Sequence, residues 1–318
     1  MNASPLPRVP FGRLGDSVTP LGFGAWAIGS KSYGQVDRGT AAATIRAYLQ
    51  AGGNFIDTAR GYGQSESVIG EVLREDQWRD QVFLCTKVGP TEPEAMRETF
   101  EESLRQLEVD CVDLLYLHSP PEEPDAMHRA IDQIVQFQNE GKVRAIGASI
   151  KGPNVTQATL DLHRQYIRTG RIDAIQLIYS ILRPDARAIF DEAKQVGVAL
   201  VGRTMLESGL LTGKYRVGHQ FPEGDHRQRW NDEKLAAIID ASERLQQEFL
   251  PSDYQSVTEL ALRFTLDEPG LTTIIPGAKS PQQMEANIAA ATRSTLEPTT
   301  IERLQQAFGH LTPIVNPS

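Results

Sequence analysis

Five polar residues recur at nearly constant spacing along this chain. Asp57, Lys87, His118, Ser149 and Gln176 close or follow apolar, strand-like runs at residues 54–56, 82–86, 112–117, 143–147 and 172–177. Successive members are 27 to 31 residues apart. One strand, one loop and one helix together use about 30 residues, so this spacing predicts repeated βα units.

Repeated βα units make all strands parallel, so the five polar side chains are expected at one end of the sheet. We therefore predict an α/β fold, a (β/α)8 TIM barrel, whose carboxyl end is where such barrels build their active sites. The 318 residues, 40% of them hydrophobic, fit one barrel domain over residues 1–318, since a single barrel commonly uses about 250 residues or more.

The other expected elements follow this rhythm, with two additions. A turn-rich segment at 11–18 predicts an N-terminal hairpin that closes the bottom of the barrel. Strands one, seven and eight are expected at 21–24, 198–202 and 271–275, and helices at 38–51, 66–74, 93–107, 126–139, 155–166, 185–196 and 299–308. The long gap between strands seven and eight predicts an insertion, a candidate lid or cofactor strap, with a polar loop at 214–232 and helices at 233–249 and 257–266.

Composition narrows the classes of partner. The 32 basic and 41 acidic residues give a formal charge of −9, which argues against a nucleic-acid or anionic-membrane partner. No apolar run approaches the ~20 residues of a membrane span, and the first residues lack the apolar core of a signal peptide, so we expect a cytoplasmic protein. Cys85 and Cys111 fall in predicted buried strands and are expected to be reduced thiols. The six histidines show no metal-ligand spacing, so no metal site is expected.

Three strand-end residues and one nearby tyrosine form a candidate acid–base group. Tyr62 follows Asp57 by five residues, in a glycine-flanked loop that can bend its ring back over the barrel mouth. A free phenol has a pKa of about 10, and a neighbouring ammonium lowers that value while a carboxylate holds the ammonium in place. Singly, Asp57, Lys87 and His118 have ordinary alternatives: a loop cap, a surface ammonium and a core histidine. Their shared spacing favours one catalytic group.

The start of the helix expected after strand eight is also informative. Ser280 is followed by proline at the first helical position and by glutamine at the third, which is the pattern of a capped helix. Free N–H groups at such a start favour an anion, and barrels often bind phosphate after strand eight. Lys279 adds a cation beside it; a capped helix with a solvated lysine is the alternative. No G-x-G-x-x-G follows a strand, so a Rossmann fold is not supported.

On these motifs the chain resembles the aldo-keto reductase family over almost its whole length. The matching stretches are residues 20–26, 57–63, 86–89, 117–120, 146–149, 209–215 and 275–278. The resemblance implies a (β/α)8 barrel that binds NADP(H), or NAD(H), extended across its mouth. It also implies that Tyr62 gives a proton to a carbonyl and that Lys87 and Asp57 tune the acidity of this phenol. His118 would orient the substrate, and hydride would pass directly from the nicotinamide.

The resemblance further implies two sets of binding residues. Ser149 and Gln176 match family positions that hold the carboxamide group of the nicotinamide. The expected substrate pocket consists of Trp26, Tyr62 and His118, although a core tryptophan is the alternative for the first of these. The expected cofactor-binding residues are Gly24, Ala25, Trp26, Asp57, Ser149, Gln176, Arg203, Leu206, Lys214, Gly277, Lys279, Gln283 and Asn287.

Three departures from the family pattern stand out. Ile150 occupies a position where many members have asparagine, which removes one carboxamide contact. Arg203 stands where an aromatic ring often stacks on the nicotinamide, and a planar guanidinium can stack there too. Gly277 and Gln283 replace basic residues that some members use on the 2′-phosphate, whereas Lys279 matches the pattern of other branches.

We therefore expect an NADP(H)-dependent oxidoreductase that reduces aldehydes or ketones, with a small-molecule carbonyl or alcohol as substrate. Two alternatives remain: an NADP(H)-binding redox-sensing regulatory subunit, and a sugar dehydrogenase that acts in the oxidative direction. The intact group of Asp57, Tyr62, Lys87 and His118 favours an enzyme over a sensor. The sequence does not indicate the physiological substrate or the oligomeric state, because loops rather than the fold shape the pocket.

Overall fold

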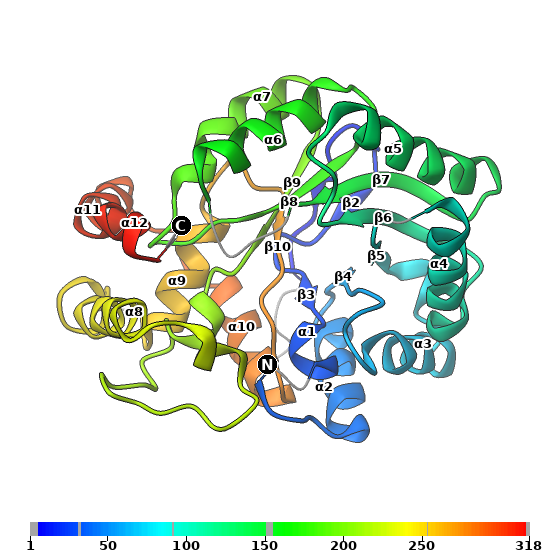
Figure 1. Cartoon of the computed structure of the whole chain (residues 1–318). Helices are drawn as coiled ribbons and strands as arrows, with labels where there is room; N and C mark the ends of the chain where they lie inside the picture. Colours follow the sequence, from blue (N-terminus) through cyan, green and yellow to red (C-terminus); the bar gives the residue numbers. More distant parts are fainter. Residues whose placement is uncertain (1–5, 31–32, 91, 151–154, 253, 316–318) are drawn as a thin grey trace.

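Eight parallel strands build the central sheet within the residues that the computed structural model describes, which are 6–30, 33–90, 92–150, 155–252 and 254–315. Their order is β10-β9-β8-β7-β6-β5-β4-β3, so each strand pairs with its successor in the chain. The strands are β3 (Phe23–Gly24), β4 (Phe55–Asp57), β5 (Phe83–Val88), β6 (Val112–His118), β7 (Val143–Ser149), β8 (Ala174–Ile178), β9 (Ala199–Arg203) and β10 (Thr273–Ile274) (Figure 1). This confirms the predicted parallel βα repeat.

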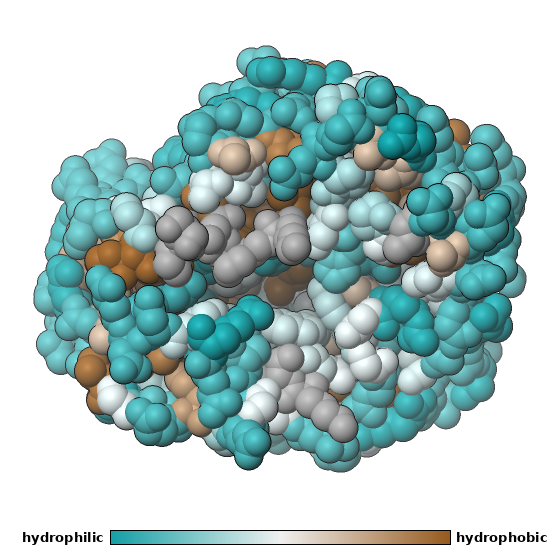
Figure 2. All heavy atoms as spheres, viewed as in Figure 1, coloured by the Kyte–Doolittle hydropathy of each residue, from teal (hydrophilic) through white to brown (hydrophobic). Residues whose placement is uncertain are grey.

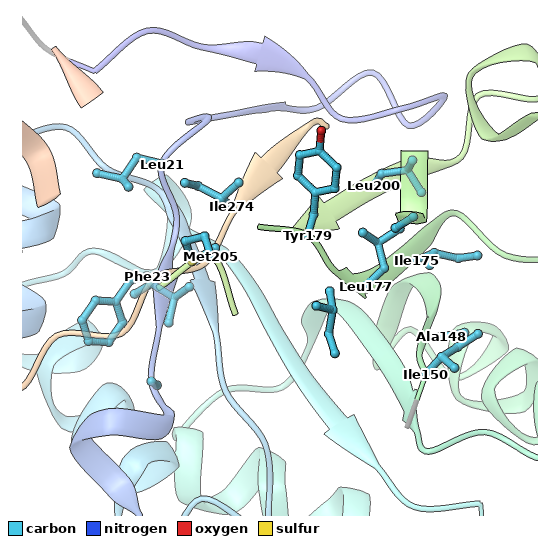
Figure 3. Packing of buried hydrophobic residues seen from close by; sticks show 14 of the residues in the cluster. Leu21, Phe23, Ala148, Ile150, Ile175, Leu177, Tyr179, Leu200, Met205 and Ile274 are labelled. Atoms are coloured by element: carbon cyan, nitrogen blue, oxygen red, sulfur yellow. The ribbon is translucent and has the colours of Figure 1, made fainter. Parts of the chain in front are cut away.

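The first and last strands meet and close the barrel. Gly22 N donates a hydrogen bond to Ile274 O at 2.7 Å, and parallel bridges join Leu21 to Ile274 and Gly24 to Gly277. Figure 3 shows the side chains of Leu21 and Ile274 lying close together at this junction. Closure leaves the sheet without an exposed edge.

Helices follow the strands and surround the barrel (Figure 1). They are α1 (Trp26–Gly29), α2 (Arg38–Gln50), α3 (Ser65–Glu75), α4 (Pro93–Leu107), α5 (Pro124–Asn139), α6 (Gln157–Arg168), α7 (Phe190–Gln195) and α10 (Pro281–Ala291). Their apolar residues recur at helical spacing: α4 buries Met96, Phe100, Leu104 and Leu107. Such a stripe drives the helix against the barrel because the opposite face is charged.

Alternation along each strand sorts side chains between two cores. Phe55 belongs to the cluster inside the barrel, together with Phe83, Leu114 and Val201. Ile56, its neighbour in β4, belongs to the cluster between strands and helices. Successive strand residues point to opposite faces, so the residue after Ile56 points inward again. That residue is Asp57, and the apolar alternation of β4 thereby delivers a carboxylate to the barrel interior.

The N-terminal hairpin plugs one end of the barrel, as predicted. β1 (Val9–Pro10) pairs antiparallel with β2 (Ser17–Val18). The ring of Phe11, between them, lies with its centroid 4.6 Å from that of Phe83, and Phe11 and Val18 belong to the barrel-interior cluster. The opposite end is left for the polar side chains.

The predicted insertion between strands seven and eight is present. It contains the short turns η4 (Glu207–Gly209) and η5 (His226–Arg229), α8 (Asp232–Arg244), a π-helical turn η6 (Leu245–Phe249) and α9 (Val257–Leu266). The described part of the chain ends with α11 (Pro298–Phe308), a 3-10 turn η7 (Gly309–Leu311) and α12 (Thr312–Val315). Among the described residues no helix has the length and apolarity needed to cross a membrane.

Three local expectations were wrong. Cys111 precedes β6 and is only partly buried, because the strand begins one residue later at Val112. The helix expected at 185–196 begins as a 3-10 turn, η3 (Asp185–Ile189), since Arg187 N bonds to Pro184 O in the tighter i to i+3 pattern. Strands one and eight are shorter than expected, because β3 and β10 have only two residues each.

Candidate active site

The strand register brings five predicted residues to the carboxyl end of the barrel. His118 pairs with Ser149 and Ser149 with Gln176 across adjacent strands. Lys87 lies near the end of β5, and Asp57 is the last residue of β4. The spacing seen in the sequence therefore does correspond to one level of the barrel.

Tyr62 reaches this level from the loop between β4 and α3. The loop turns at Gly63, whose φ is +58°, a conformation that side chains rarely adopt. It also packs directly on α1: a Cβ built on Gly29 would lie 1.8 Å from Tyr62 O. Glycines at both contact points therefore let the tyrosine loop close down against the barrel.

Lys87 is the centre of the predicted acid–base group. Its fully buried Nζ donates to Asp57 Oδ1 at 2.5 Å and to Thr58 O at 2.8 Å, and it lies 4.9 Å from the centroid of the Tyr62 ring. Burial alone would lower the pKa of Lys87, but the Asp57 carboxylate and the Tyr62 phenol together raise it above its ordinary value. The side chain is therefore a charged ammonium held directly beside the phenol.

The other oxygen of Asp57 is bonded to the predicted carboxamide-binding pair. Gln176 Nε2 donates to Asp57 Oδ2 at 2.8 Å, and Ser149 Oγ donates to Gln176 Oε1 at 3.1 Å. All three side chains are buried. One continuous hydrogen-bonded chain thus links Ser149, Gln176, Asp57 and Lys87.

His118 faces the tyrosine and is uncharged near neutral pH. The two rings are 6.1 Å apart at 83°, an edge-to-face arrangement. Burial, together with the positive charges of Lys87 and Arg203, lowers the pKa of His118 to about 4. A neutral imidazole can donate a hydrogen bond from one ring nitrogen, but it supplies no cation to the site.

A cavity of about 750 Å³ opens over this group. Figure 2 shows that the viewed face of the molecule is hollowed near its centre, with apolar residues in the hollow and a mainly hydrophilic surface around it. The cavity is lined by nearly every residue predicted to bind cofactor or substrate: Gly24, Trp26, Asp57, Tyr62, His118, Ser149, Gln176, Arg203, Leu206, Lys214, Gly277, Lys279, Gln283 and Asn287. Lys87 lies buried beneath the floor. Ala25 is buried and does not line the cavity.

The start of α10 forms one end of the cavity and is capped as predicted. Ser280 Oγ accepts a hydrogen bond from Gln283 N at 3.3 Å, and Gln283 Oε1 accepts one from Lys279 N at 2.9 Å. The ammonium of Lys279 is not merely solvated, because its Nζ donates to Tyr33 O at 2.6 Å. A cation and a capped helix start therefore share this wall.

One unsatisfied donor in the cavity wall fits a dinucleotide, whose phosphates, sugars and bases offer hydrogen-bond acceptors. Asn287 lines the cavity, and its buried Nδ2 has no hydrogen-bond partner within the described part of the chain, so it is a donor that a ligand could satisfy. Gly24 and Gly277 also line the cavity, at the seam where the first and last strands pack closely: a Cβ on Gly24 would lie 2.5 Å from Ile275 O. These residues, with Ser149, Gln176 and Arg203, are the ones that would hold the cofactor.

Arg203 is half-buried in the cavity wall. Its Nη2 donates to Ile150 O at 3.0 Å, and its Nη1 donates to Thr204 Oγ1 at 3.3 Å. Burial lowers the pKa of Arg203 to about 10, so the guanidinium keeps its charge at neutral pH. Arg203, which stands where family members often have an aromatic residue, thus donates a hydrogen bond to the backbone oxygen of Ile150.

Several wall residues were missed in the sequence. Tyr33 packs edge-on against Trp26, with ring centroids 4.9 Å apart, and the Arg227 guanidinium lies 5.1 Å from the Tyr33 ring. Asp225 neutralises Arg227 through a contact of 2.6 Å. Glu259, from α9, also lines the cavity. Residues 226–230 contain two arginines, a histidine and a tryptophan within an otherwise ordinary polar loop. This composition could have indicated that the loop contributes to the cavity wall.

Comparison with known proteins agrees with this geometry. The model of the aldo/keto reductase family matches residues 20–308. The chain is 30% identical over 313 residues to the NADH-specific methylglyoxal reductase of Escherichia coli strain K12, covering 89% of this chain and 93% of that protein. It is 31% identical over 290 residues to the aldo-keto reductase YhdN of Bacillus subtilis strain 168, covering 86% and 85%.

Solved structures give the same result. An aldo-keto reductase from Bacillus halodurans, in its holo form, superposes with a TM-score of 0.75 and 27% identity, covering 95% of this chain and 96% of that one. The fold and the polar group at its carboxyl end define an oxidoreductase built on a (β/α)8 barrel. The chain belongs to the aldo/keto reductase family, whose members use nicotinamide cofactors.

Proposed function

We propose that this protein is an NADP(H)-preferring reductase that converts aldehydes or ketones to alcohols, with Tyr62 as the proton donor. The observation that carries the proposal is the position of Lys87 Nζ, 2.5 Å from Asp57 Oδ1 and 4.9 Å from the centroid of the Tyr62 ring. A buried ammonium beside a phenol stabilises the phenolate that forms when the proton leaves.

Each residue of the group has a distinct task. Tyr62 donates its phenolic proton to the carbonyl oxygen, and Lys87 stabilises the resulting negative charge. Asp57 holds the ammonium in place, since it accepts hydrogen bonds from both Lys87 and Gln176. His118, which is neutral, orients the carbonyl by a hydrogen bond. The bound nicotinamide supplies the hydride.

The charge state of His118 supports the choice of proton donor. With a pKa of about 4, its imidazole has no extra proton to give near pH 7. Tyr62 has an ammonium next to it, and both side chains line or underlie the same cavity. The histidine is therefore assigned to orientation and the tyrosine to proton transfer.

The preference for the phosphorylated cofactor rests on the start of α10. Lys279 and the capped N-terminus after Ser280 provide a cation and backbone donors at one wall of the cavity. A 2′-phosphate carries close to two negative charges and suits such donors better than a bare hydroxyl does. One relative is NADH-specific, so this preference depends on this chain's own residues and has to be measured.

Replacement of the phenol tests the proposal directly. Wild-type protein should oxidise NADPH when given an activated aldehyde. Tyr62→Phe keeps the ring's packing but removes the proton, so turnover should fall by roughly 10²–10⁴-fold while NADPH binding, followed by its fluorescence, persists. Turnover of the variant within threefold of wild type would show that another group donates the proton.

A wild type that binds NADPH but reduces none of a panel of aldehydes and ketones would point instead to the sensor alternative. Faster oxidation of sugars than reduction of carbonyls, with both directions measured on the same preparation, would favour the dehydrogenase alternative. The same assays therefore separate all three functions.

A further inference from the structure

Lys279 makes a contact that its proposed role in phosphate binding does not explain. Its Nζ donates to the backbone oxygen of Tyr33 at 2.6 Å, across 246 residues of sequence. Gly34, the next residue, has a φ of +88°, so glycine is needed where the chain turns. A Cβ built on Gly34 would lie 3.9 Å from Lys279 Nζ, which places this turn directly against the ammonium.

Tyr33 is in turn part of the wall beside the predicted substrate pocket. Its ring packs edge-on on Trp26 with a centroid distance of 4.9 Å, and Trp26 lies 6.4 Å from the ring of Tyr62. On the other side the Tyr33 ring contacts His226, with centroids 4.4 Å apart, and Arg227. The position of Tyr33 therefore decides where one aromatic side of the pocket lies.

We propose that Lys279 is a positioning residue for the substrate pocket: by holding the Tyr33 carbonyl it fixes the Trp26–Tyr33 wall against which the carbonyl substrate packs. A residue at the adenosine end of the cofactor site thus sets substrate affinity at the other end. The kinetic test of this assignment rests on the proposed reductase function, whereas the structural test does not. It needs no 2′-phosphate, because the bond forms in the protein alone.

The kinetic test uses NADH, which has no phosphate for Lys279 to bind. Lys279→Ala should raise the KM for a small aldehyde by about tenfold, the effect of losing one charge-assisted hydrogen bond, while kcat changes less than twofold. Lys279→Arg keeps a donor of similar reach and should restore most of the lost affinity. An unchanged aldehyde KM in Lys279→Ala would overturn the proposal.

A double-mutant cycle shows whether the effect passes through Tyr33. Tyr33→Ala removes the ring that the bond positions, so adding Lys279→Ala to it should raise the aldehyde KM by less than twofold more. If the two substitutions instead multiply, Lys279 acts on the substrate by another route and the proposed wall contact is wrong.

The structural test works without substrate or cofactor. The chain has three tryptophans, so Trp78→Phe with Trp230→Phe leaves Trp26 as the sole indole. In this background Lys279→Ala should raise the acrylamide quenching constant of Trp26 fluorescence at least twofold, whereas Lys279→Arg should not. Equal quenching in all three proteins would contradict the proposal even if no aldehyde is reduced, and increased quenching with no reductase activity would mean that only the proposed function had failed.

Discussion

Gln176 donates a hydrogen bond from Nε2 to Asp57 Oδ2 at 2.8 Å, although 119 residues separate the two. Lys87 occupies the other oxygen of the same carboxylate at 2.5 Å. Asp57 is therefore held from both sides, once by the predicted catalytic cation and once by a predicted cofactor-binding amide. The proposed chemistry and the proposed cofactor binding therefore share one buried carboxylate.

Replacing Lys87 and replacing Asp57 should therefore affect activity to different extents. Lys87→Met should abolish most activity, because it removes the cation that stabilises the phenolate and leaves the Asp57 charge buried without its partner. Asp57→Asn should lose less activity, since the ammonium remains, bonded to Thr58 O at 2.8 Å. We would compare kcat and its pH profile for both variants. A Lys87→Met enzyme with the rate and pH profile of wild type would exclude the tuning role.

Cofactor preference should respond to Lys279. A charge-assisted hydrogen bond is worth about 1.5–3 kcal/mol, so Lys279→Ala should weaken NADPH binding by roughly tenfold to a hundredfold. The Kd for NADH should barely change, because NADH lacks the 2′-phosphate. Fluorescence titration gives both constants for both proteins. Equal losses for the two cofactors, or a wild type that binds NADH more tightly, would refute the assignment of this helix start.

Stability should fall in mild acid, partly because of a histidine outside the cavity floor. His163 is buried, its Nδ1 lies 2.5 Å from Thr159 O, and burial lowers its pKa from 6.5 to about 4. Between these values the unfolded chain binds a proton that the folded protein does not, so the free energy of unfolding falls as pH drops from about 6.5 to 4. The loss from this residue is of the order of 3 kcal/mol.

Urea unfolding at several pH values measures that loss. His163→Gln cannot titrate in this range, so its free energy of unfolding should fall less steeply over the same pH interval. His118 shifts in the same direction and should keep part of the slope. A variant with the full wild-type slope would show that His163 does not stay neutral in the folded protein.

A second buried ion pair should matter for folding rather than chemistry. Arg183 Nη2 lies 2.5 Å from Glu207 Oε2 with both side chains buried, and Ser180 also bonds to that carboxylate. Arg183→Met leaves the Glu207 charge unpaired and should cost about 3–5 kcal/mol in urea unfolding. The exposed pair of Arg38 with Glu71 is the control, and Arg38→Met should cost about 1 kcal/mol or less. Similar costs for both variants would mean that Glu207 becomes protonated or finds another cation.

The elements that were predicted well are those fixed by short-range pattern. The helix from 93 to 107 has apolar residues at helical spacing, and its predicted bounds match α4. The start of α10 was readable because Ser280 and Gln283 form a local capping pattern. Cys111 was misplaced because it immediately precedes the apolar run at 112–117, and β6 begins with that run at Val112.

The sequence by itself determined the parallel βα repeat, the level at which Asp57, Lys87 and His118 meet, and the family, because period and motif are local properties. Only the tertiary structure decided that Gln176 bonds to Asp57, that Lys279 reaches Tyr33, and that Tyr33 and Arg227 complete the cavity wall. These contacts join residues far apart in the chain, on different strands and loops. Which residues become partners depends on burial and on the distances between side chains in the packed structure. Neither can be read from the sequence of a single segment.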